Sequence, residues 1–213
     1  MAARSDNSLV KNSSGLLRGT GEGIVIDIGT GDGRFVSAAA RANPNKFFIG
    51  IDANTKPLEK PSMKATRKPA KGGLPNVLFV QATVEDLPEE LDGIANEIHV
   101  HFPWGSLLGA VARGDEAILG SLRRLAASDC LLEIVIGVDA GRDAAELARL
   151  GIPDLSLTYI RGELIPKYQQ AAFKIVDHGV LESTDWTRLE TSWARKLQGN
   201  HNRTVFFLVF RAI

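Results

Sequence analysis

The sequence predicts an α/β protein whose single domain is doubly wound around a mostly parallel, seven-stranded sheet with an antiparallel C-terminal strand. Short β-branched runs alternate with helix-favouring segments, which is the pattern of a parallel sheet covered by helices on both faces. The first two runs have an acidic residue at or next to their ends, and glycines follow the first of them. The chain has 213 residues, of which 44% are hydrophobic, so it is long enough to bury one substantial core.

The expected strands are short apolar runs, and they cover residues 24–28, 46–52, 77–81, 97–102, 131–138, 173–181 and 204–211. The expected helices cover residues 34–42, 115–127 and 163–172, and the first of them stops at Asn43 because Pro44 restricts the residue before it. No clear full helix joins the last two strands, which favours an antiparallel hairpin at one edge of the sheet. The connections at 55–76 and 182–203 are too long for simple turns, and long connections often carry function.

Charge and cysteine content exclude several classes of protein. The chain carries 25 Lys and Arg and 25 Asp and Glu, so nucleic-acid binding cannot rest on bulk charge and requires basic residues gathered on one face. The single cysteine, Cys130, excludes an internal disulfide and suits a reducing compartment. No run approaches the roughly 18 apolar residues of a membrane span. Residues 1–23 lack the apolar core of a signal peptide, so we expect a cytoplasmic protein. We also expect a monomer, with an N-terminal extension at 1–23 and one domain at 24–213.

A glycine-rich turn, D-I-G-T-G-D-G, directly follows the first predicted strand and precedes a helix. Glycines in such a turn let a ligand approach the backbone closely. Asp52 ends the second predicted strand, where a carboxylate can bind both hydroxyls of a ribose. The two features together predict a site for an adenosine-containing cofactor, because a turn of purely structural glycines would leave Asp52 unexplained.

The acidic residues of the turn indicate which cofactor binds. The glycine spacing differs from the G-x-G-x-x-G of dinucleotide sites, and Asp27 and Asp32 would repel a pyrophosphate. The same carboxylates suit the sulfonium and amino groups of S-adenosylmethionine, whose product after methyl transfer is S-adenosylhomocysteine. We expect this cofactor to contact Asp27, Gly29, Thr30, Gly31, Asp32, Gly33 and Asp52.

The turn after the third predicted strand is the expected adenine site. In this architecture it lies over the adenine ring, so backbone amides of Thr83 and Val84 and the carboxylate of Glu85 or Asp86 would read the edge of the base. An ordinary cap between a strand and a helix is the alternative. Ala82, Thr83, Val84 and Glu85 complete the expected cofactor contacts.

Two tryptophans suit a planar methyl acceptor. Trp104 lies in a Pro-Trp-Gly loop at the carboxyl end of a central strand, where open α/β sheets bind ligands. Trp193 lies in the last long connection, which can fold back over the same mouth. Stacking on an aromatic is worth about 1–3 kcal/mol per base, which offsets the few kcal/mol of extruding one. The alternative is that Trp104 packs on the cofactor as a lid. Pro103 and Ser192 would shape the pocket or fix its loops.

Basic residues gather in the two long connections. The first holds Lys56, Lys60, Lys64, Arg67, Lys68 and Lys71, and the second holds Arg188, Arg195, Lys196 and Arg203. A solvated charged face is the alternative, but both clusters flank the proposed mouth of a neutral protein, which favours RNA binding. His99 and His101 alternate on one predicted strand. Without a Cys, Asp or Glu at metal spacing, they favour structural roles, and we expect no metal.

Six segments in order across the chain carry a family resemblance. They are VIDIGTGDG (25–33), GIDAN (50–54), KPAKGGLPN (68–76), ATVEDLP (82–88), FPWGSLL (102–108) and LETSWARKL (189–197). The first is common to many methyltransferases, whereas KGGLPN, FPWGSLL and TSWARKL together are far more specific. Through them the chain resembles the aminoglycoside-resistance 16S ribosomal RNA (adenine-N1)-methyltransferases, which modify adenine 1408 in the decoding site.

The resemblance implies a Rossmann-like methyltransferase fold, ribose recognition by Asp52, and a target adenine flipped out between Trp104 and Trp193. The implied partner is 16S rRNA in the 30S subunit. Its implied contacts are Lys64, Arg67, Lys68 and Lys71 in the first connection, and Arg203 on the backbone of the flipped nucleotide, with Arg195 and Lys196 beside it. Family members begin with a strand hairpin, which the glycine- and serine-rich residues 1–23 do not resemble.

The implied reaction is a direct displacement in which adenine N1 attacks the methyl carbon. N1 already carries a lone pair at neutral pH, so the reaction needs no general base and no metal, and catalysis would come mostly from positioning. The added methyl and positive charge would block a drug that hydrogen-bonds this edge of the base. Two alternatives are a small-molecule N-methyltransferase with a closed pocket and an inactive RNA-binding homologue, against which the intact glycine turn and Asp52 argue.

Overall fold

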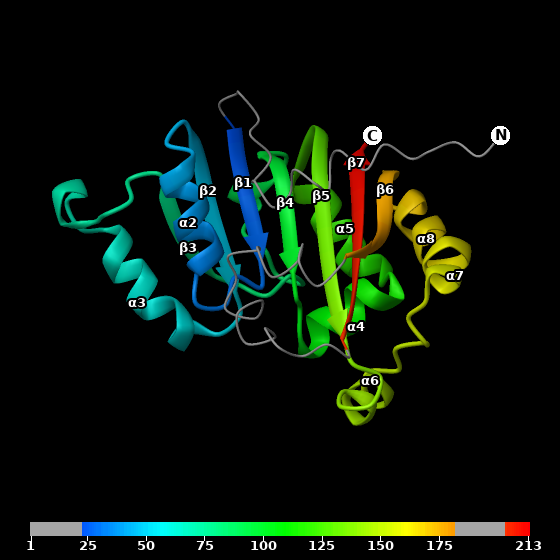
Figure 1. The fold of residues 1–213 in the computed structure, drawn as a ribbon. Helices are drawn as coiled ribbons and strands as arrows, with labels where there is room; N and C mark the ends of the chain where they lie inside the picture. Colours follow the sequence, from blue (N-terminus) through cyan, green and yellow to red (C-terminus); the bar gives the residue numbers. More distant parts are fainter. Residues whose placement is uncertain (1–22, 182–202) are drawn as a thin grey trace.

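A twisted seven-stranded sheet runs through the middle of the molecule (Figure 1). The computed structural model describes residues 23–181 and 203–213. The strand order is β3-β2-β1-β4-β5-β7-β6, and every pair from β3 to β5 is parallel, whereas β7 is antiparallel to both β5 and β6. The strands are β1 (Gly23–Ile28), β2 (Lys46–Asp52), β3 (Val77–Gln81), β4 (Ala95–His101), β5 (Ala126–Val138), β6 (Phe173–Leu181) and β7 (Thr204–Ala212).

Helices cover both faces of the sheet. In Figure 1, α2 lies in front of the sheet, and α4 and α5 lie behind it. The α-helices are α2 (Arg34–Ala42), α3 (Thr55–Ala65), α4 (Gly105–Arg113), α5 (Glu116–Leu125), α6 (Ala144–Arg149), α7 (Leu157–Tyr159) and α8 (Ile165–Gln170). The short helices η1 (Pro69–Lys71), η2 (Glu89–Leu91) and η3 (Ile160–Leu164) lie between them. None of the described helices is long and apolar enough to cross a membrane.

Successive side chains of β4 point to opposite faces of the sheet and meet different surroundings there. Ile98 and Val100 belong to the larger core, in which the sheet packs against α4, α5 and α8. The intervening His99 and His101 face the other side, where the ring of Phe35 from α2 lies 5.2 and 4.7 Å from their ring centroids. Since successive side chains of a strand point to opposite faces, this side of the central strands carries buried polar groups.

The structure confirms the predicted fold and all seven predicted strands, with β4 and β5 beginning earlier than expected. The last two strands form the expected antiparallel hairpin, in which β6 is the edge strand and β7 lies between β5 and β6. The helix expected at 115–127 is α5, and Asp115 caps it by accepting hydrogen bonds from the backbone N–H groups of Ala117 and Ile118. The helix expected at 163–172 is divided between η3 and α8.

The connection at 55–76 contains more regular structure than expected. It forms α3 and η1, although Pro57 and Pro61 lie within the helix. Asn54 caps α3, because its side chain accepts a hydrogen bond from the N–H of Lys56, and Pro57 occupies the first turn, where its missing N–H costs nothing. Leu58 and Ala65 bury one side of the helix. The helix α4 was also not expected from the sequence.

Gly33 ends the glycine turn and begins α2 with a φ of 64°, and a Cβ there would lie 2.5 Å from Cε1 of Phe79. We expect Gly33→Ala to lower the free energy of unfolding by about 1–3 kcal/mol, because a left-handed backbone and overlap with the half-buried ring of Phe79 both cost energy. The measurement is equilibrium unfolding in urea. The matched control is Gly120→Ala in the exposed part of α5, where an added Cβ meets nothing within 4 Å and should raise stability by up to about 1 kcal/mol. Equal effects of the two substitutions would contradict this account of Gly33.

Candidate functional site

A cavity of about 280 Å³ opens at the carboxyl ends of the central parallel strands. This volume is near the lower end of the range for small-molecule sites. The glycine turn after β1, the end of β2, the turn after β3 and the loop after β4 all contribute to it. The lining consists of residues 27–32, 35, 51–53, 82–85, 101–104, 106 and 107. It therefore contains every predicted cofactor contact except Gly33, which is buried against Phe79 instead.

The glycine turn curls over the end of β2. Gly29 and Gly31 have φ angles of 76° and 57°, which residues other than glycine rarely adopt. The backbone N–H groups of Gly29 and Thr30 both donate to the carbonyl of Ile51, at 2.8 and 3.0 Å. A Cβ on Gly29 would lie 2.8 Å from the side chain of Leu107. The turn thus keeps bare backbone along one wall of the cavity.

Asp52 joins the two strand ends that flank the cavity. Its Oδ2 accepts a hydrogen bond of 2.8 Å from the N–H of Gly31, and its Oδ1 accepts one of 2.9 Å from the N–H of Asn54. Each carboxylate oxygen has a second acceptor position, so a ribose hydroxyl can still bind to each. This geometry fits the predicted contact with a ribose.

The two acidic residues of the glycine turn have different environments. Asp27 is 4% exposed, and burial raises the pKa of its carboxyl, while nearby His101 opposes that shift. Asp32 lies at the rim, where its Oδ2 is 2.9 Å from Nε of Arg34. Asp27 is therefore the deep carboxylate of the cavity, and Asp32 is already paired with a cation of this chain.

The turn after β3 closes the side of the cavity next to Asp52. The N–H of Ala82 donates to the carbonyl of Asp52 at 3.2 Å, and the backbones of Thr83 and Asp86 pair in a single antiparallel β-bridge. Val84 is buried, whereas Glu85 is exposed and lines the cavity. Of the two carboxylates predicted for the adenine edge, Glu85 lines this cavity and Asp86 does not.

Trp104 lies at the mouth of the cavity. Phe102, which directly follows β4, has a φ of 48°, an uncommon value for a non-glycine residue, and this bend carries the chain away from the sheet. Pro103 is buried, and Trp104 is 42% exposed while still lining the cavity. Its side chain therefore reaches both the cavity and the surface of the protein. Trp193 and Ser192 lie outside the described residues.

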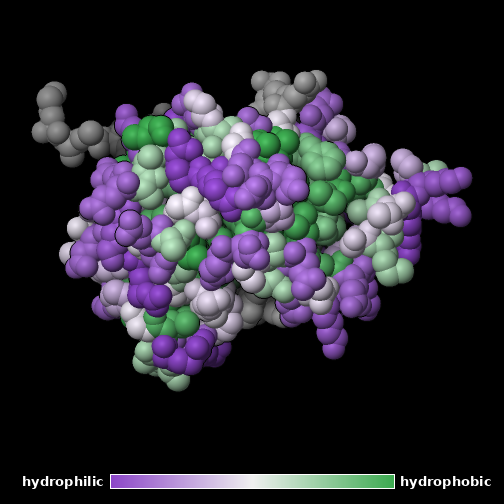
Figure 2. Space-filling view, turned by 180° about the vertical axis from the view of Figure 1, so that it is seen from behind, coloured by the Kyte–Doolittle hydropathy of each residue, from purple (hydrophilic) through white to green (hydrophobic). Residues whose placement is uncertain are grey.

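The first basic connection forms an edge of the molecule next to β3 (Figure 1). Lys56, Lys60 and Lys64 are exposed and four residues apart on α3, so they lie along one side of the helix. Arg67, Lys68 and Lys71, which follow on the segment through η1, are exposed as well. Figure 2 shows hydrophilic side chains projecting at this edge. We name these six residues the basic edge.

Arg203 is directed into the protein. Its Nη1 donates to Oδ2 of Asp143 and to the carbonyl of Gly137, both at 2.7 Å, and its side chain is 7% exposed. The guanidinium therefore ties the residue before β7 to the segment after β5. The predicted contact of Arg203 with RNA would require this ion pair to open. Arg195 and Lys196 lie outside the described residues.

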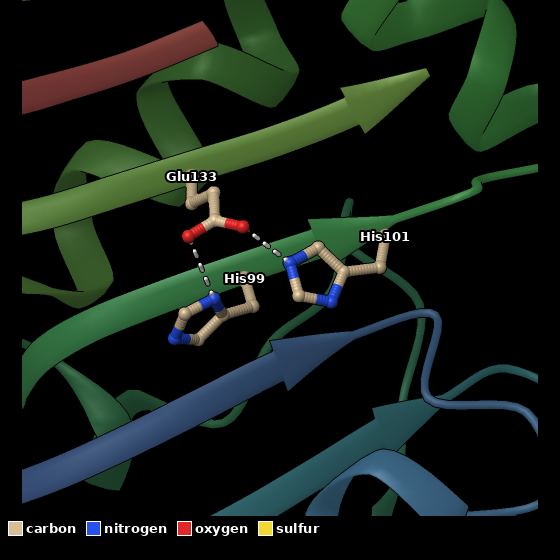
Figure 3. Close-up of side chains that lie close together, drawn as sticks. All are labelled: His99, His101 and Glu133. Atoms are coloured by element: carbon tan, nitrogen blue, oxygen red, sulfur yellow. Dashed lines mark hydrogen bonds and ion pairs between the residues drawn. The ribbon is translucent and has the colours of Figure 1, made fainter. Parts of the chain in front are cut away.

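Some residues of the cavity were not expected from the sequence. Phe35, His101 and Leu107 line it, although none of them was predicted to contact the cofactor or the substrate. The alternation of His101 with Val100 could have placed this imidazole on the polar side of β4. Glu133 on β5 was not expected near the two histidines, yet its carboxylate lies between them (Figure 3).

Comparisons with known proteins match nearly the whole chain. The family model NpmA, described as 16S rRNA (adenine(1408)-N(1))-methyltransferase, matches residues 10–211. A protein of that description from Escherichia coli is 37% identical over 182 residues, which cover 85% of this chain and 83% of the relative. Another from Streptoalloteichus tenebrarius is 36% identical over 188 residues, which cover 88% of this chain and 86% of the relative.

Solved structures are similar over the same length. The crystal structure of the aminoglycoside resistance methyltransferase NpmB1 has a TM-score of 0.80 and 42% identity, and the match covers 99% of this chain and 95% of that one. A tryptophan-to-alanine mutant of the 16S rRNA (adenine(1408)-N(1))-methyltransferase from Catenulisporales acidiphilia, solved with its cosubstrate SAM, has a TM-score of 0.82 and 31% identity. That match covers 99% of this chain and 93% of the other.

We expect Asp52→Ala to weaken the binding of S-adenosylmethionine at least tenfold, which corresponds to about 1.4 kcal/mol, because both ribose acceptors and the anchor of Gly31 are lost. Isothermal titration calorimetry measures the affinity. Glu59→Ala removes an equal charge from the exposed side of α3 and should leave it unchanged. An unchanged affinity of the Asp52 variant would place the ribose elsewhere.

Proposed function

This chain belongs to the family of 16S rRNA (adenine(1408)-N1)-methyltransferases, and we propose that it methylates N1 of adenine 1408 in the 30S subunit with S-adenosylmethionine bound in the cavity. The observation that carries the proposal is the position of Trp104. It places an aromatic side chain at the mouth of a cavity that Asp52 and the glycine turn also line. A planar base stacked there would present its edge to the bound methyl donor.

The residues of the cavity fit the cofactor. Asp52 keeps acceptor positions for the ribose, and the turn from Ala82 to Glu85 faces the place expected for the adenine. Asp27 supplies a buried carboxylate near the place expected for the cationic methionine end. When bound, S-adenosylmethionine supplies an electrophilic methyl group.

We assign the contribution of this chain to positioning. Adenine N1 carries a lone pair at neutral pH, so no side chain has to remove a proton before the methyl group is transferred. N1 lies on the Watson–Crick edge, so the base must leave the helix to react. Trp104, together with Trp193 from the last connection, would hold the extruded base and stabilise the positive charge that develops on it. Pro103 and Ser192 would fix the loops that carry these rings.

The basic edge suits the phosphate backbone of rRNA. It concentrates six cations on one side of a chain whose formal net charge is zero. Such an edge supports docking on the assembled 30S subunit, whose surface is large enough to reach both this edge and the cavity. We propose that the protein acts as a monomer in the cytoplasm, where the ribosomal subunits are.

Resistance to aminoglycosides follows from the chemistry of the product. N1-methyladenine carries a fixed positive charge and has lost the acceptor at N1. A cationic drug that hydrogen-bonds this edge therefore meets both electrostatic repulsion and a methyl group in its place.

Methyl transfer from labelled S-adenosylmethionine to purified 30S subunits tests the proposal, with primer extension to locate the methylated base. We expect incorporation of one methyl group and a reverse-transcription stop at adenine 1408. Naked 16S rRNA serves as the comparison substrate. Weaker labelling of naked RNA than of 30S subunits would support docking on the assembled subunit. Incorporation at another base, or none despite cofactor binding, would refute the assigned substrate.

Trp104→Ala should slow methylation of 30S subunits by about ten- to a hundredfold, since a stacking contact of about 1–3 kcal/mol is lost. Trp104→Phe keeps an aromatic face and should retain most of the rate. Single-turnover kinetics measure both variants, and calorimetry with S-adenosylmethionine serves as the control, because the cofactor should bind both equally. Equal rates for the alanine variant and the native protein would rule out a stacking role for Trp104.

Lys68→Glu should weaken 30S association by several-fold and reduce the dependence of binding on salt, because an ion pair with a phosphate is replaced by repulsion. Filter binding across a salt series measures both quantities. Lys174→Glu makes the same charge change on the exposed surface of β6, at the opposite edge of the sheet, and should have little effect. Equal effects of the two variants would mean that the basic edge is only a solvated surface.

A further inference from the structure

Two imidazoles and one carboxylate meet inside the protein on the side of the sheet that faces α2. Nε2 of His101 lies 3.0 Å from Oε1 of Glu133, and Nδ1 of His99 lies 3.8 Å from Oε2 of the same carboxylate. Figure 3 shows the carboxylate of Glu133 between the two rings. All three residues are less than 8% exposed, and one potential ligand atom from each lies within 4.8 Å of the other two.

The strand register keeps this arrangement in place. His99 pairs with Glu133 across β4 and β5, and it pairs with Asp27 across β1 and β4. His101 follows two residues later on the same face of β4. The three potential ligands therefore come from neighbouring strands in the middle of a sheet, which holds them without help from a loop.

The surroundings of His99 resemble the outer shell of a metal site. Its Nδ1 is directed to Glu133, while its Nε2 lies 3.5 Å from Oε2 of Glu97. Glu97 is held in turn by Nζ of Lys46, at 2.5 Å from Oε1. Metal-binding histidines commonly face a carboxylate with their second nitrogen, which orients the ring. The ring of Phe35 closes the side toward α2.

The local charge also favours a cation. Glu97 has Lys46 as its partner, but the ion pairs of Glu133 among the described residues involve only the two histidines. Nδ1 of His101 has no hydrogen-bond partner in the described part of the chain. Asp27, also buried, is the cross-strand neighbour of His99. Buried carboxylates of this kind are stabilised by a cation or by protonated partners.

We propose that His99, His101 and Glu133 form a binding site for a divalent transition metal of the zinc type. Two imidazole nitrogens and one carboxylate oxygen are a common protein ligand set for Zn²⁺, at metal–ligand distances of about 2.0–2.2 Å, with a fourth position for water. Ligand atoms at such distances lie roughly 3–4 Å apart in a tetrahedron, so the three side chains need only small shifts. The metal would link β4 to β5, and it would lie beside the cofactor cavity because His101 lines both.

The test uses the full chain, stripped of metal with a chelator and titrated with Zn²⁺ against a chromophoric competitor. We expect one Zn²⁺ per chain, and we expect His99→Gln and Glu133→Gln each to weaken binding by at least tenfold. His178→Gln is the matched control, because His178 lies on the far strand β6, is only partly buried and accepts a hydrogen bond from Arg161. Zn²⁺ should raise the melting temperature of the native protein and of the His178 variant, but not of the other two.

Co²⁺ bound in place of Zn²⁺ reports on the ligands of the metal by spectroscopy. This measurement uses the native protein, so misfolding of a variant cannot affect it. A bound Co²⁺ should give visible ligand-field absorption, and its X-ray absorption spectrum should contain scattering from two imidazoles. Native protein without a stoichiometric Zn²⁺ site, variants that bind as tightly as the native protein, or a Co²⁺ spectrum without imidazole scattering would each overturn the proposal and leave the cluster as an ion-pair network. The measurement needs neither S-adenosylmethionine nor ribosomes, so its failure would leave the proposed methyl transfer unaffected.

Discussion

The hydrogen bond from the N–H of Gly31 to Asp52 is the interaction on which the cofactor site depends. It joins the turn after β1 to the end of β2, and two further hydrogen bonds from the turn to Ile51 hold the same contact. Parallel pairing makes this possible, because the register of Ile28 with Ile51 places the two carboxyl ends side by side. The bond also orients the Asp52 carboxylate, so a single interaction both shapes the cavity wall and leaves acceptors free for a ribose.

The side of the sheet below this cavity carries an unusual number of buried ionisable groups. Asp27, His99 and Glu133 form a row across three neighbouring strands, where apolar side chains are the rule in a parallel sheet. Burial of charge is costly unless each group has a partner, so the row is stable only as a connected set. Asp27 belongs both to this row and to the lining of the cofactor cavity, so the two share a buried carboxylate.

Zero net charge conceals a strongly asymmetric surface. The basic edge comes from α3 and the segment through η1, and the helix aligns Lys56, Lys60 and Lys64 on one side. Local composition predicted the cluster of cations, but the two prolines obscured the helix that arranges them. The cap at Asn54 and the burial of Leu58 outweigh the hydrogen bond that Pro61 removes.

The sequence by itself determined the strands, the glycine turn with Asp52, the loop of Trp104 and the family, because each can be recognised from short segments of the chain and their order. Only the tertiary structure decided which distant groups meet. Glu133 is 32 positions from His101, and Arg203 is 60 from Asp143, so no local spacing indicated either contact. The register of β4 with β5 brings the first pair together, and the return of the chain into β7 brings the second. Such contacts follow from strand pairing and burial across the whole domain, which local propensity does not encode.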